Sequence, residues 1–566
     1  MNTGLSLSDY IVFIVYFVIV VSYGFWIYNK KKKAVMDTHD YFLAEGSLTW
    51  WAIGASMIAS NISAEQFIGM SGEGFFVGMA VASYEWVAAI ALIIIAVWFM
   101  PIYLKNKIYT MPQFLTQRYN ETVALIMAIF WLFLYVLVNL TSILYLGAIA
   151  ISGLMGPEYF YPILLALAIF SMFITLGGMK VIGYTDVIQV GVLIIGGLAT
   201  VYMALDMVGV KLGGGGGAIA GFNALMEHAP GHFHMMLPKP EGQVATSEAH
   251  QLAIDKYLVL PGLATYAAGT WIVNLNYWGC NQYITQRALG ANLQTARTGI
   301  LFSGLLKLLM PVIVMLPGIC AYVLYHNNLL PGFEGKKDGA YSAILAFLPS
   351  GLKGLAVAAL TAAIVASLAG KLNSISTIFT LDIYKKHLKK EADEKNMVWI
   401  GRVTVLVATL VAIFFTWKDT LGIGGEGGFT YIQKYTGFIS PGVFAMFLLG
   451  MFWKRTTGAA AVAGVLVGFL LSVFFNQYAP AVLGNENILY TAYQNKEGVW
   501  EIPFLICMGW SFFFTMLVMI GISLAGPKVN PKAYELDASM FRVNKGTMAL
   551  IMVTLMLIIA LYAKFW

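Results

Sequence analysis

Charged residues are scarce in this chain. Only 11% of its 566 residues are Asp, Glu, Lys or Arg, whereas 59% are hydrophobic; ordinary soluble domains carry roughly a quarter charged residues. This balance excludes the soluble classes and predicts a polytopic membrane protein, with the length filled by apolar segments of about 20 residues. The net charge of +6 does not indicate a nucleic acid partner, because the basic residues lie in short connections between apolar segments.

Cysteine is rare as well. Cys280, Cys320 and Cys507 all fall within apolar segments and form no pattern typical of a disulfide framework or a zinc site. The sequence has no HExxH motif, no paired acids beside a nucleophile and no metal-binding cluster, so we expect no enzymatic activity and no cofactor. His232 and His234 form a weak metal motif without a third ligand nearby, and we favour an ordered loop turn there.

Hydropathy predicts about fourteen transmembrane helices. Their centres lie near Val20, Ala59, Leu92, Leu134, Ala168, Ile195, Ile272, Val312, Ala363, Ala408, Ser440, Val467, Phe513 and Leu555. The first apolar run, 11–28, follows an acidic residue and precedes a lysine cluster, so we expect a membrane span there rather than a signal peptide.

Basic residues accumulate in alternate connections between these segments. The positive-inside rule assigns such connections to the cytoplasm, and an even number of spans then leaves both termini outside. The basic residues assigned in this way include Lys30, Lys105, Arg118, Arg287, Arg297, Lys385, Lys454 and Lys532.

The segment from Asp40 to Trp86 contains a polar stretch where lipid demands apolar side chains. After two tryptophans and several small residues, positions 60–66 read SNISAEQ. Polar residues at that depth are costly unless they face a partner or a water-filled cavity. Many secondary transporters build an ion and solute site from a helix broken in mid-bilayer. The stretch therefore predicts a broken helix, with a segment serving only helix packing as the alternative.

A repeat at the level of the fold is expected, although no short sequence repeat is visible. Five spans across 48–210 and five across 258–453 would be related by inversion, because an odd number of spans per repeat reverses the second copy. The second set also opens with an interrupted helix that carries Asn274, Asn276 and Tyr277. An extra helix, 10–28, precedes the repeats, three peripheral helices in 457–566 follow, and residues 1–566 form a single transporter domain.

Glu85 and Lys307 are the clearest ions inside apolar segments. Burying either alone costs several kcal/mol or more, so pairing is expected. In a shared hydrated cavity Glu85 accepts and Lys307 donates hydrogen bonds, while Gln66, Asn274 and Gln433 do both. This mixture suits a neutral polyhydroxylated ligand. The alternative is a structural ion pair with amides that are satisfied between helices.

Aromatic placement also favours a sugar. Tyr277 lies one turn after Asn274, so the two share a helix face, and a tyrosine offers a flat apolar face to a sugar ring. Met70, Tyr84 and Phe429 are positioned to close the cavity from outside. For each aromatic residue, ordinary core packing is the alternative.

A sodium site is predicted at Ala59, Ile62, Ala363 and Ser367. A hard monovalent cation prefers oxygen ligands, and an unwound helix frees carbonyl groups to supply them. The small residues of 358–376 also permit close helix approach, so a simple packing face is the alternative. Asp186 lies near the cytoplasmic end of a span, where it guides an exiting cation or caps a helix.

Six stretches of the chain resemble a known family. They are DYFLAEGSLTWWAIGASMIASNISAEQFIGMSG from Asp40, ASYEW from Ala82, TDVIQV from Thr185, NYWGCNQYITQR from Asn276, AAIVASLAGKLNSISTIFTLDIYK from Ala362 and FTYIQKYTGFISPG from Phe429. Over nearly its whole length the chain resembles the sodium:solute symporter family, in its sodium/glucose cotransporter branch, and especially the bacterial sodium/galactose members.

This resemblance implies an all-α polytopic protein of the LeuT-type fold, with a five-plus-five inverted-repeat core. It also implies secondary active symport, in which inward sodium movement drives uptake of a neutral hexose (galactose or glucose) by alternating access. Another solute, such as myo-inositol, a sialic acid, a nucleoside or an amino acid, stays open, as does a channel. The expected location is a bacterial inner membrane, and no pattern specifies an oligomeric state.

The resemblance also implies a role for each matching residue. The ligands of sugar hydroxyls are Gln66, Glu85, Asn274, Lys307 and Gln433. The inner gate is Tyr277, held by Asn61, and the outer gate is Met70, Tyr84 and Phe429. The sodium site is Ala59, Ile62, Ala363 and Ser367, and Asp186 lies on the sodium exit route.

Two positions depart from the family pattern. Ala366 precedes Ser367 where the pattern has two adjacent serines at the sodium site, so one hydroxyl is missing and the affinity and stoichiometry for sodium are open. Ala88 stands where the pattern has a serine that touches the sugar. One such hydrogen bond contributes roughly 0.5–1.5 kcal/mol, so its loss retunes affinity for a hexose more readily than it abolishes binding.

Overall fold

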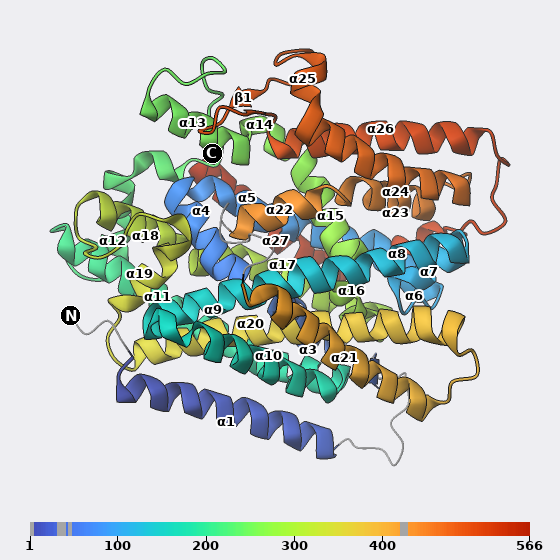
Figure 1. Cartoon of the computed structure of the whole chain (residues 1–566), viewed down its shortest axis with the longest axis horizontal. Helices are drawn as coiled ribbons and strands as arrows, with labels where there is room; N and C mark the ends of the chain where they lie inside the picture. Colours follow the sequence, from blue (N-terminus) through green and yellow to red (C-terminus); the bar gives the residue numbers. More distant parts are fainter. Residues whose placement is uncertain (1–4, 31–40, 43–47, 419–427) are drawn as a thin grey trace.

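The computed structural model of the chain describes residues 5–30, 41, 42, 48–418 and 428–566, with the side chains of residues 30, 268 and 428–431 excepted. This part is almost entirely helical (Figure 1). It contains 11 helices that are long and apolar enough to cross a membrane, and a pair of helices bent by 76°, Glu248–Ala267 with Thr270–Cys280, raises the number to 12 if the pair is one span. The chain is therefore a multi-pass membrane protein.

The fourteen predicted centres all lie in helices, but the structure does not confirm the count. Three of them, near Ala59, Ile272 and Ser440, fall in helices that are interrupted or short. The helix Ser440–Phe452 has only 13 residues. Hydropathy averages over a window of about 20 residues, so it registers an apolar stretch and misses a break within it.

The first half of the chain forms the helices before the long connection at 212–217. These are α1 (Leu7–Lys30), α3 (Trp50–Asn61), η2 (Glu65–Met70), α4 (Ser71–Phe76), η3 (Met79–Ala82), α5 (Ser83–Ile94), η4 (Ile95–Phe99), α6 (Met100–Lys105), α7 (Met111–Arg118), α8 (Glu121–Phe133), η5 (Leu134–Leu140), α9 (Thr141–Met155), η6 (Pro157–Tyr159), α10 (Phe160–Leu176) and α11 (Met179–Lys211). Thr110 and Asn120 cap α7 and α8 by accepting from main-chain amides of the first turn.

The middle of the chain runs from residue 218 to residue 416. Its elements are α12 (Ala218–His228), η7 (Pro230–Phe233), α13 (Glu248–Val259), α14 (Gly262–Ala264), η8 (Thr265–Gly269), α15 (Thr270–Cys280), α16 (Gln282–Leu289), α17 (Leu293–Val314), α18 (Leu316–His326), η9 (Lys337–Gly339), α19 (Ala340–Ala346), α20 (Leu352–Thr377), η10 (Ile378–Leu388) and α21 (Glu394–Thr416).

The last part of the chain, from residue 428 onwards, adds the helices that follow α21. They are α22 (Gly428–Gly437), α23 (Ser440–Phe452), α24 (Gly458–Val473), η11 (Phe474–Tyr478), α25 (Ala479–Leu483), α26 (Phe504–Leu524), η12 (Ala538–Phe541) and α27 (Lys545–Phe565). A short hairpin of β1 (Tyr493–Gln494) and β2 (Trp500–Glu501) pairs antiparallel, with Tyr493 opposite Glu501.

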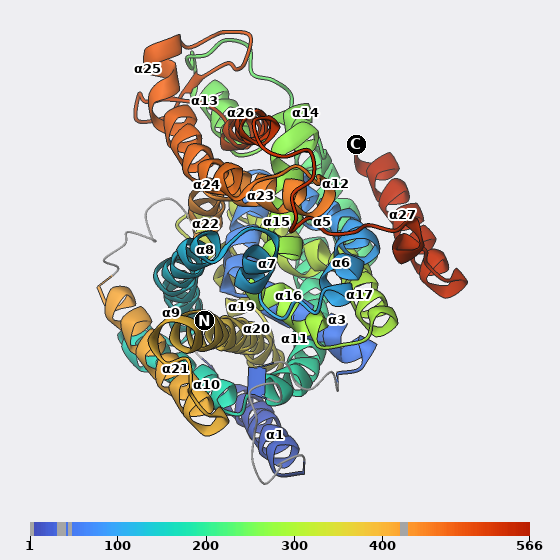
Figure 2. The same ribbon diagram turned by 90° about the vertical axis from the view of Figure 1, so that its right-hand side faces the viewer.

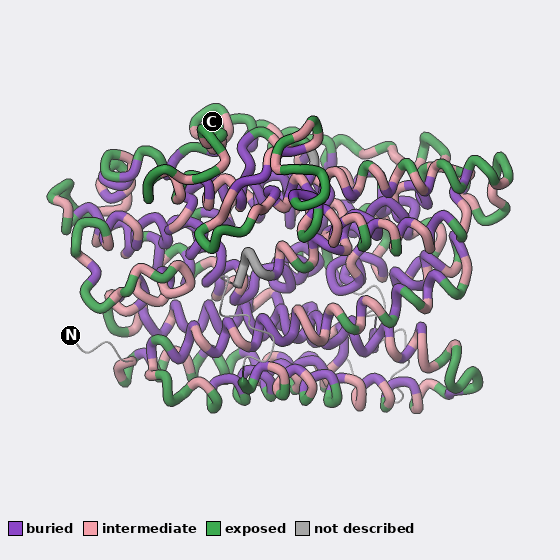
Figure 3. The backbone as a smooth tube through the Cα atoms, turned by 45° about the horizontal axis from the view of Figure 1, so that its top comes forward, coloured by how far each residue is buried: buried purple, intermediate pink, exposed green. Residues whose placement is uncertain are grey.

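Helix α20 forms the centre of the molecule. All of its residues except Leu352 and Leu355 are buried, and it packs against α11, α10, α1, α21 and α3. Small residues permit this close approach: a Cβ added to Gly196 of α11 would lie 2.8 Å from the Cβ of Ala359. Helices α1, α24, α26 and α27 lie at the periphery (Figure 2), and burial is concentrated between them (Figure 3).

Contacts between connections place the described ends of the chain on one face. Asp9 at the start of α1 accepts from the Gly351 amide at 2.7 Å. Lys211 at the end of α11 donates to a main-chain carbonyl of the α18–α19 connection at 3.0 Å. The Met235 amide donates to the carbonyl of Phe565 at 2.8 Å. Since the connections at 212–247 and 327–351 belong to this face, the start of α1 and the end of α27 lie on the same side.

Three of the arginines assigned to cytoplasmic connections are in fact buried. Arg118 is 0% exposed, Arg287 2% and Arg297 5%. The Arg118 guanidinium donates to the carbonyls of Gly450, Trp453 and Thr456 around the end of α23, where unpaired helix carbonyls accept a cation. These arginines bind main-chain oxygens or a carboxylate, so a loop position inferred from hydropathy does not imply exposure.

Candidate functional site

Eight of the residues predicted to bind or gate the solute line one cavity between the helices. Its volume of about 80 Å³ exceeds that of a single ordered water, which takes up roughly 10–15 Å³ on this scale. The eight are Asn61, Gln66, Tyr84, Glu85, Asn274, Tyr277, Lys307 and Gln433. They come from α3, η2, α5, α15, α17 and α22, so segments nearly 400 residues apart in sequence meet here.

Glu85 and Lys307 form the predicted ion pair. The Lys307 ammonium donates to a Glu85 carboxylate oxygen and to the side-chain oxygen of Asn61, and it lies 5.1 Å from the centre of the Trp278 ring. Lys307 is 1% exposed and Glu85 4%. Because each charge meets the other, this pair brings no net charge to the cavity wall.

Tyr277 lines the cavity, and Asn61 contacts its hydroxyl. The Asn61 side-chain amide donates to the Tyr277 hydroxyl at 3.0 Å, and the Tyr277 ring packs edge-on against Tyr283 and Trp278. A continuous set of polar contacts therefore links Glu85 to Tyr277 across four helices, α5, α17, α3 and α15.

The first predicted helix break is present. Helix α3 ends at Asn61, and Ile62 is extended, with φ −77° and ψ 116°. The Ser63 amide donates to the Gln66 side-chain oxygen at 3.1 Å; in a continuous α-helix the same amide would donate to the carbonyl of Ala59. The polar stretch at 60–66 thus supplies the side chains that cap the break, and Gln66 takes part both in the cap and in the cavity wall.

The helix predicted to be interrupted in the second set is bent by 76° before α15 and is interrupted again after it. Asn274, Asn276 and Tyr277 sit within α15, where the Asn274 side chain donates to the carbonyl of Thr270 at 3.0 Å. The helix ends at Cys280, and Asn281 is extended, with φ −93° and ψ 127°. The amides of α15 bond locally or to α23, so their polarity marked the cavity wall rather than the interruption itself.

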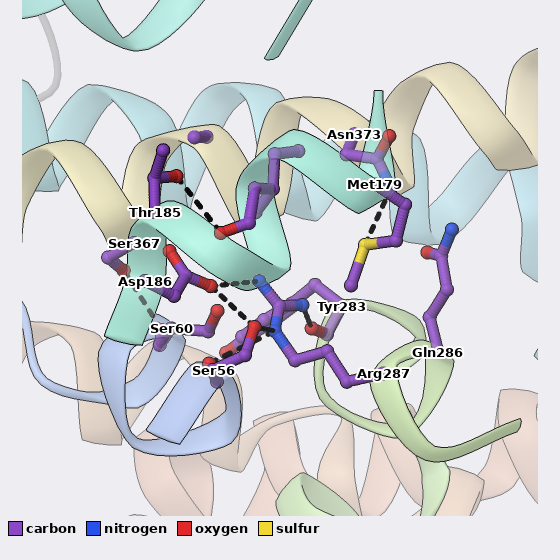
Figure 4. A network of polar contacts seen from close by, with 12 residues as sticks. Ser56, Ser60, Met179, Thr185, Asp186, Tyr283, Gln286, Arg287, Ser367 and Asn373 are labelled. Carbon is purple, nitrogen blue, oxygen red and sulfur yellow. Dashed lines mark hydrogen bonds and ion pairs between the residues drawn. The ribbon is translucent and has the colours of Figure 1, made fainter. Parts of the chain in front are cut away.

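The residues predicted to bind sodium are gathered beside the first break. Ala59, Ile62, Ala363 and Ser367 are all buried. The Ser367 hydroxyl donates to the carbonyl of Ser60 at 3.0 Å, so the middle of α20 touches the last turn of α3 (Figure 4).

Asp186 does not cap a helix, and this alternative is wrong. It lies two turns inside α11 and is fully buried. Its carboxylate accepts from the Ser56 hydroxyl and lies 3.7 Å from a guanidinium nitrogen of Arg287, which also donates to the Ser56 carbonyl at 3.0 Å. Figure 4 shows Arg287 reaching towards Asp186 and Ser56. This network joins α3, α11 and α16.

The three residues predicted for the outer gate have different positions. Tyr84 lines the cavity. Met70, in η2, is fully buried but outside the cavity wall, and the side chain of Phe429 lies outside the described residues. Glu73 of α4, which is not part of the cavity wall, binds the ammonium of Lys337 at 2.9 Å.

Sequence reasoning missed several residues of the site. Trp131, Asn139, Asn281 and Thr436 also line the cavity. Lys371 was missed beside the predicted sodium site: its ammonium donates to the Ser367 hydroxyl at 2.8 Å. A charge one turn from Ser367 in an otherwise small and apolar helix was the signal that could have identified it.

The weak metal motif is an ordered turn, as expected. His232, in η7, is buried, and its Nε2 donates to the carbonyl of Phe75 at 3.2 Å. His234 faces the carbonyl of Trp566 at 3.4 Å. Among the described residues no group of three or more His, Cys, Asp or Glu side chains is arranged to hold a metal ion. The three cysteines are free and buried.

Comparison with known proteins agrees with this architecture. The sequence pattern of the sodium:solute symporter family matches residues 41–468. A sodium/glucose cotransporter of Vibrio parahaemolyticus is 40% identical over 580 residues, covering 100% of this chain and 99% of that protein. The human sodium/myo-inositol cotransporter 2 is 33% identical, covering 83% of this chain and 70% of that protein.

A solved structure has the same fold. It is the substrate-bound, outward-open state of a Na⁺-coupled sialic acid symporter, with a TM-score of 0.74 at 19% identity, covering 93% of this chain and 99% of that one. The predicted all-α, LeuT-type fold is thereby confirmed. Together with the match over residues 41–468, this means that the chain belongs to the sodium:solute symporter family.

Proposed function

We propose that this chain is a secondary active symporter that couples inward sodium movement to uptake of a neutral hexose, galactose or glucose, by alternating access. Its relatives include the sodium/glucose cotransporter of Vibrio parahaemolyticus, which matches over the full length. The observation that carries the sugar assignment is the cavity in which Glu85, Lys307, Asn61 and Tyr277 are joined by polar contacts.

The pairing of Glu85 with Lys307 in the cavity wall favours a neutral solute. Lys307 is neutralised by Glu85 within the wall, so an anionic or cationic ligand would meet no uncompensated partner in this pair. The amides of Gln66, Asn274 and Gln433 both donate and accept, as each hydroxyl of a sugar does. A hexose ring stacked on Tyr277 would offer its hydroxyls to these groups in the proposed complex.

The proposed sodium site lies between the end of α3 and the middle of α20. Its ligands are the main-chain oxygens of Ala59, Ile62 and Ala363 and the hydroxyl of Ser367. The extended backbone at Ile62 supports this assignment, because residues that leave the helix release carbonyls for an ion. Asp186, buried two turns from the cytoplasmic end of α11, is proposed for the route by which sodium leaves.

Sodium occupancy then determines whether the sugar is held. The ion fixes the broken helix in the shape that presents Gln66, the outer gate of Met70, Tyr84 and Phe429 closes, and Tyr277 later opens towards the cytoplasm. One charge that crosses 100 mV supplies about 2.3 kcal/mol, equivalent to roughly a fifty-fold sugar ratio before the sodium gradient itself is counted.

We also propose the topology. Residues 48–210 and 258–453 form two inverted repeats, each opened by a broken helix, with 10–28 and 457–566 outside them. The start of α1 and the end of α27 share the face of the connections at 212–247 and 327–351, while the basic connections belong to the other face. The positive-inside rule then assigns both termini to the outside of a bacterial inner membrane.

The test is uptake of labelled galactose and glucose into proteoliposomes, with an inward gradient of sodium or of choline. We expect accumulation with sodium only. Gln66→Ala should raise the half-saturating sugar concentration at least tenfold, and Ser367→Ala should abolish sodium-driven accumulation. Gln294→Ala, an exposed change on α17, is the matched control. Accumulation that is indifferent to replacing sodium by choline would contradict the proposal.

A second solute is favoured by one comparison. The human sodium/myo-inositol cotransporter 2 is 33% identical, and inositol, like a hexose, is a neutral ring of hydroxyls. Competition with unlabelled myo-inositol, sialic acid and a nucleoside in the same assay distinguishes the classes: we expect galactose or glucose to compete at the lowest concentration.

A further inference from the structure

The proposed sodium site already has a cation beside it. Lys371 lies one turn after Ser367 on α20 and is 2% exposed. Its ammonium donates to the Ser367 hydroxyl at 2.8 Å, and that hydroxyl donates in turn to the carbonyl of Ser60 at 3.0 Å. A side chain of α20 is thus connected through one hydroxyl to the last turn of α3, immediately before the helix break.

A second partner for this ammonium lies on the other side of the break. Glu65, the first residue of η2, interacts electrostatically with Lys371. One of the Glu65 carboxylate oxygens is buried and has no hydrogen-bond partner in the described part of the chain. Glu65 also lines the solute cavity next to Gln66, so it belongs to both sites.

The remaining charged groups around Lys371 leave Glu65 as its natural counter-charge. From α16, Arg287 adds a like charge, and the Arg287 guanidinium is held by Asp186 of α11. The ring of Tyr283 lies 4.5 Å from the Lys371 ammonium, which is the distance of a cation–π contact. Asp186 and Glu65 each have one buried carboxylate oxygen without a hydrogen-bond partner in the described residues, but Asp186 already faces the Arg287 guanidinium at 3.7 Å.

An ammonium and a sodium ion compete for Ser367 in this arrangement, because both are cations that seek the same oxygen. The hydroxyl donates its one proton to the carbonyl of Ser60, and the Lys371 ammonium occupies one of its two acceptor lone pairs. A sodium ion bound to the other lone pair of the same oxygen would be repelled by the positive charge of the ammonium a few ångström away. Binding of sodium at Ser367 therefore favours the departure of Lys371.

Resting on the sodium site of the proposed function, we propose that Lys371 is a tethered competitor of the coupling ion. Without sodium, the Lys371 ammonium holds the Ser367 hydroxyl and ties α20 to the broken helix. When sodium arrives, the ammonium moves to Glu65. Lys371 is thus a specificity-determining residue that raises the sodium concentration required for binding and reports sodium occupancy to the wall of the solute cavity through Glu65.

The test compares Lys371→Met, Glu65→Gln and a matched control in purified protein. The readout is the sodium concentration that half-maximally raises the thermal unfolding temperature in detergent without sugar, at constant ionic strength with choline. Lys371→Met should lower this concentration at least tenfold. Glu65→Gln should raise it severalfold, because the displaced ammonium has lost its destination. Lys353→Met, the matched control, makes the same change at a buried lysine near the start of α20. It should leave the half-maximal sodium concentration unchanged.

Charge balance is controlled by a double variant. Lys371→Met alone leaves Glu65 without its counter-charge and can reduce folding yield, whereas Glu65→Gln with Lys371→Met removes both charges. The double variant should keep the lowered sodium requirement and should lose the dependence of sugar affinity on sodium. An unchanged or raised requirement in both Lys371 variants would overturn the inference.

Uptake in proteoliposomes separates this inference from the proposed function. If wild-type uptake requires sodium and Lys371→Met requires as much sodium as the wild type, the competitor role fails and symport stands. If wild-type uptake ignores sodium and Lys371→Met becomes sodium-dependent, the competitor role stands and sodium coupling of the native chain fails. If neither protein responds to sodium in either assay, both fail.

Discussion

Replacing Asp186 by asparagine should destabilise the protein strongly, and more than the replacement of the buried Asp382 by asparagine. Asp186 and Arg287 have side chains that are each 1% exposed. Asparagine can still accept from the Ser56 hydroxyl, so the substitution removes the charge while keeping the shape and one hydrogen bond. The Arg287 guanidinium is then left buried without its counter-charge.

The expected cost follows from that unpaired charge. Breaking a buried ion pair by removing one partner costs about 3–5 kcal/mol, because the remaining ion has lost water and found no replacement. The contacts of Arg287 with the carbonyls of Ser56 and Tyr283 persist and place the expected value towards 3 kcal/mol. Combining Asp186→Asn with Arg287→Gln removes both charges and should recover part of the lost stability. The cost of this double variant should therefore be smaller than the sum of the costs of the two single variants.

The assay is unfolding in mixed detergent micelles followed by tryptophan fluorescence. Asp382→Asn is the matched control: Asp382 is also buried, but its partner Lys386, at 2.8 Å, has a side chain that is 31% exposed and can return to water. Its cost should stay near 1 kcal/mol. If Asp186→Asn and Asp382→Asn cost the same, or if the double variant costs the sum of the two single variants, the ion-pair reasoning is refuted.

Three further changes test the gate, a buried histidine and the sodium site. Tyr277→Phe removes the acceptor of the Asn61 amide, a contact of about 0.5–1.5 kcal/mol, so sugar efflux should accelerate about two- to tenfold; unchanged efflux would argue against a gate. Burial lowers the pKa of His232 to about 4, so below pH 6.5 the unfolded chain binds a proton that the folded chain does not. Stability should therefore fall by about 1.4 kcal/mol per pH unit down to pH 4. His232→Asn should flatten this dependence of the unfolding free energy on pH, and an equally steep profile would contradict the argument. Ala366→Ser restores a hydroxyl beside Ser367 and should lower the half-saturating sodium concentration for uptake about two- to tenfold; an unchanged value would exclude this position from the site.

Several features of the site could be predicted because the membrane penalises exceptions. Two opposite charges in apolar segments, Glu85 and Lys307, were expected to meet since neither is tolerated alone in lipid, and they do. The polar stretch at 60–66 was expected to break its helix, and Ile62 is extended. In both cases the cost of burying a polar group was large enough for the feature to be predicted from the residues of one segment.

Other features required the position of a partner far away in the sequence. Arg287 reads as an ordinary basic residue at the end of a span, and only the packing of α16 against α3 and α11 brings it to Asp186. The second helix break could not be assigned to Asn281, because an amide that lines a cavity and an amide beside a break look alike in sequence. The count of about fourteen spans is not confirmed for a related reason: hydropathy sums composition and does not register a change of direction.

The sequence by itself determined that the chain crosses a membrane many times, that one span is fractured, and which side chains are too polar for lipid, since these follow from the free energy of transferring each group out of water. Apart from the expected pairing of Glu85 with Lys307, the tertiary structure decided which of those side chains become neighbours. Lys371 points at Ser367 rather than into solvent because of the way α20 is rotated against α3. This rotation is set by the packing of small residues along the whole contact between the two helices, so no single residue in the sequence predicts it.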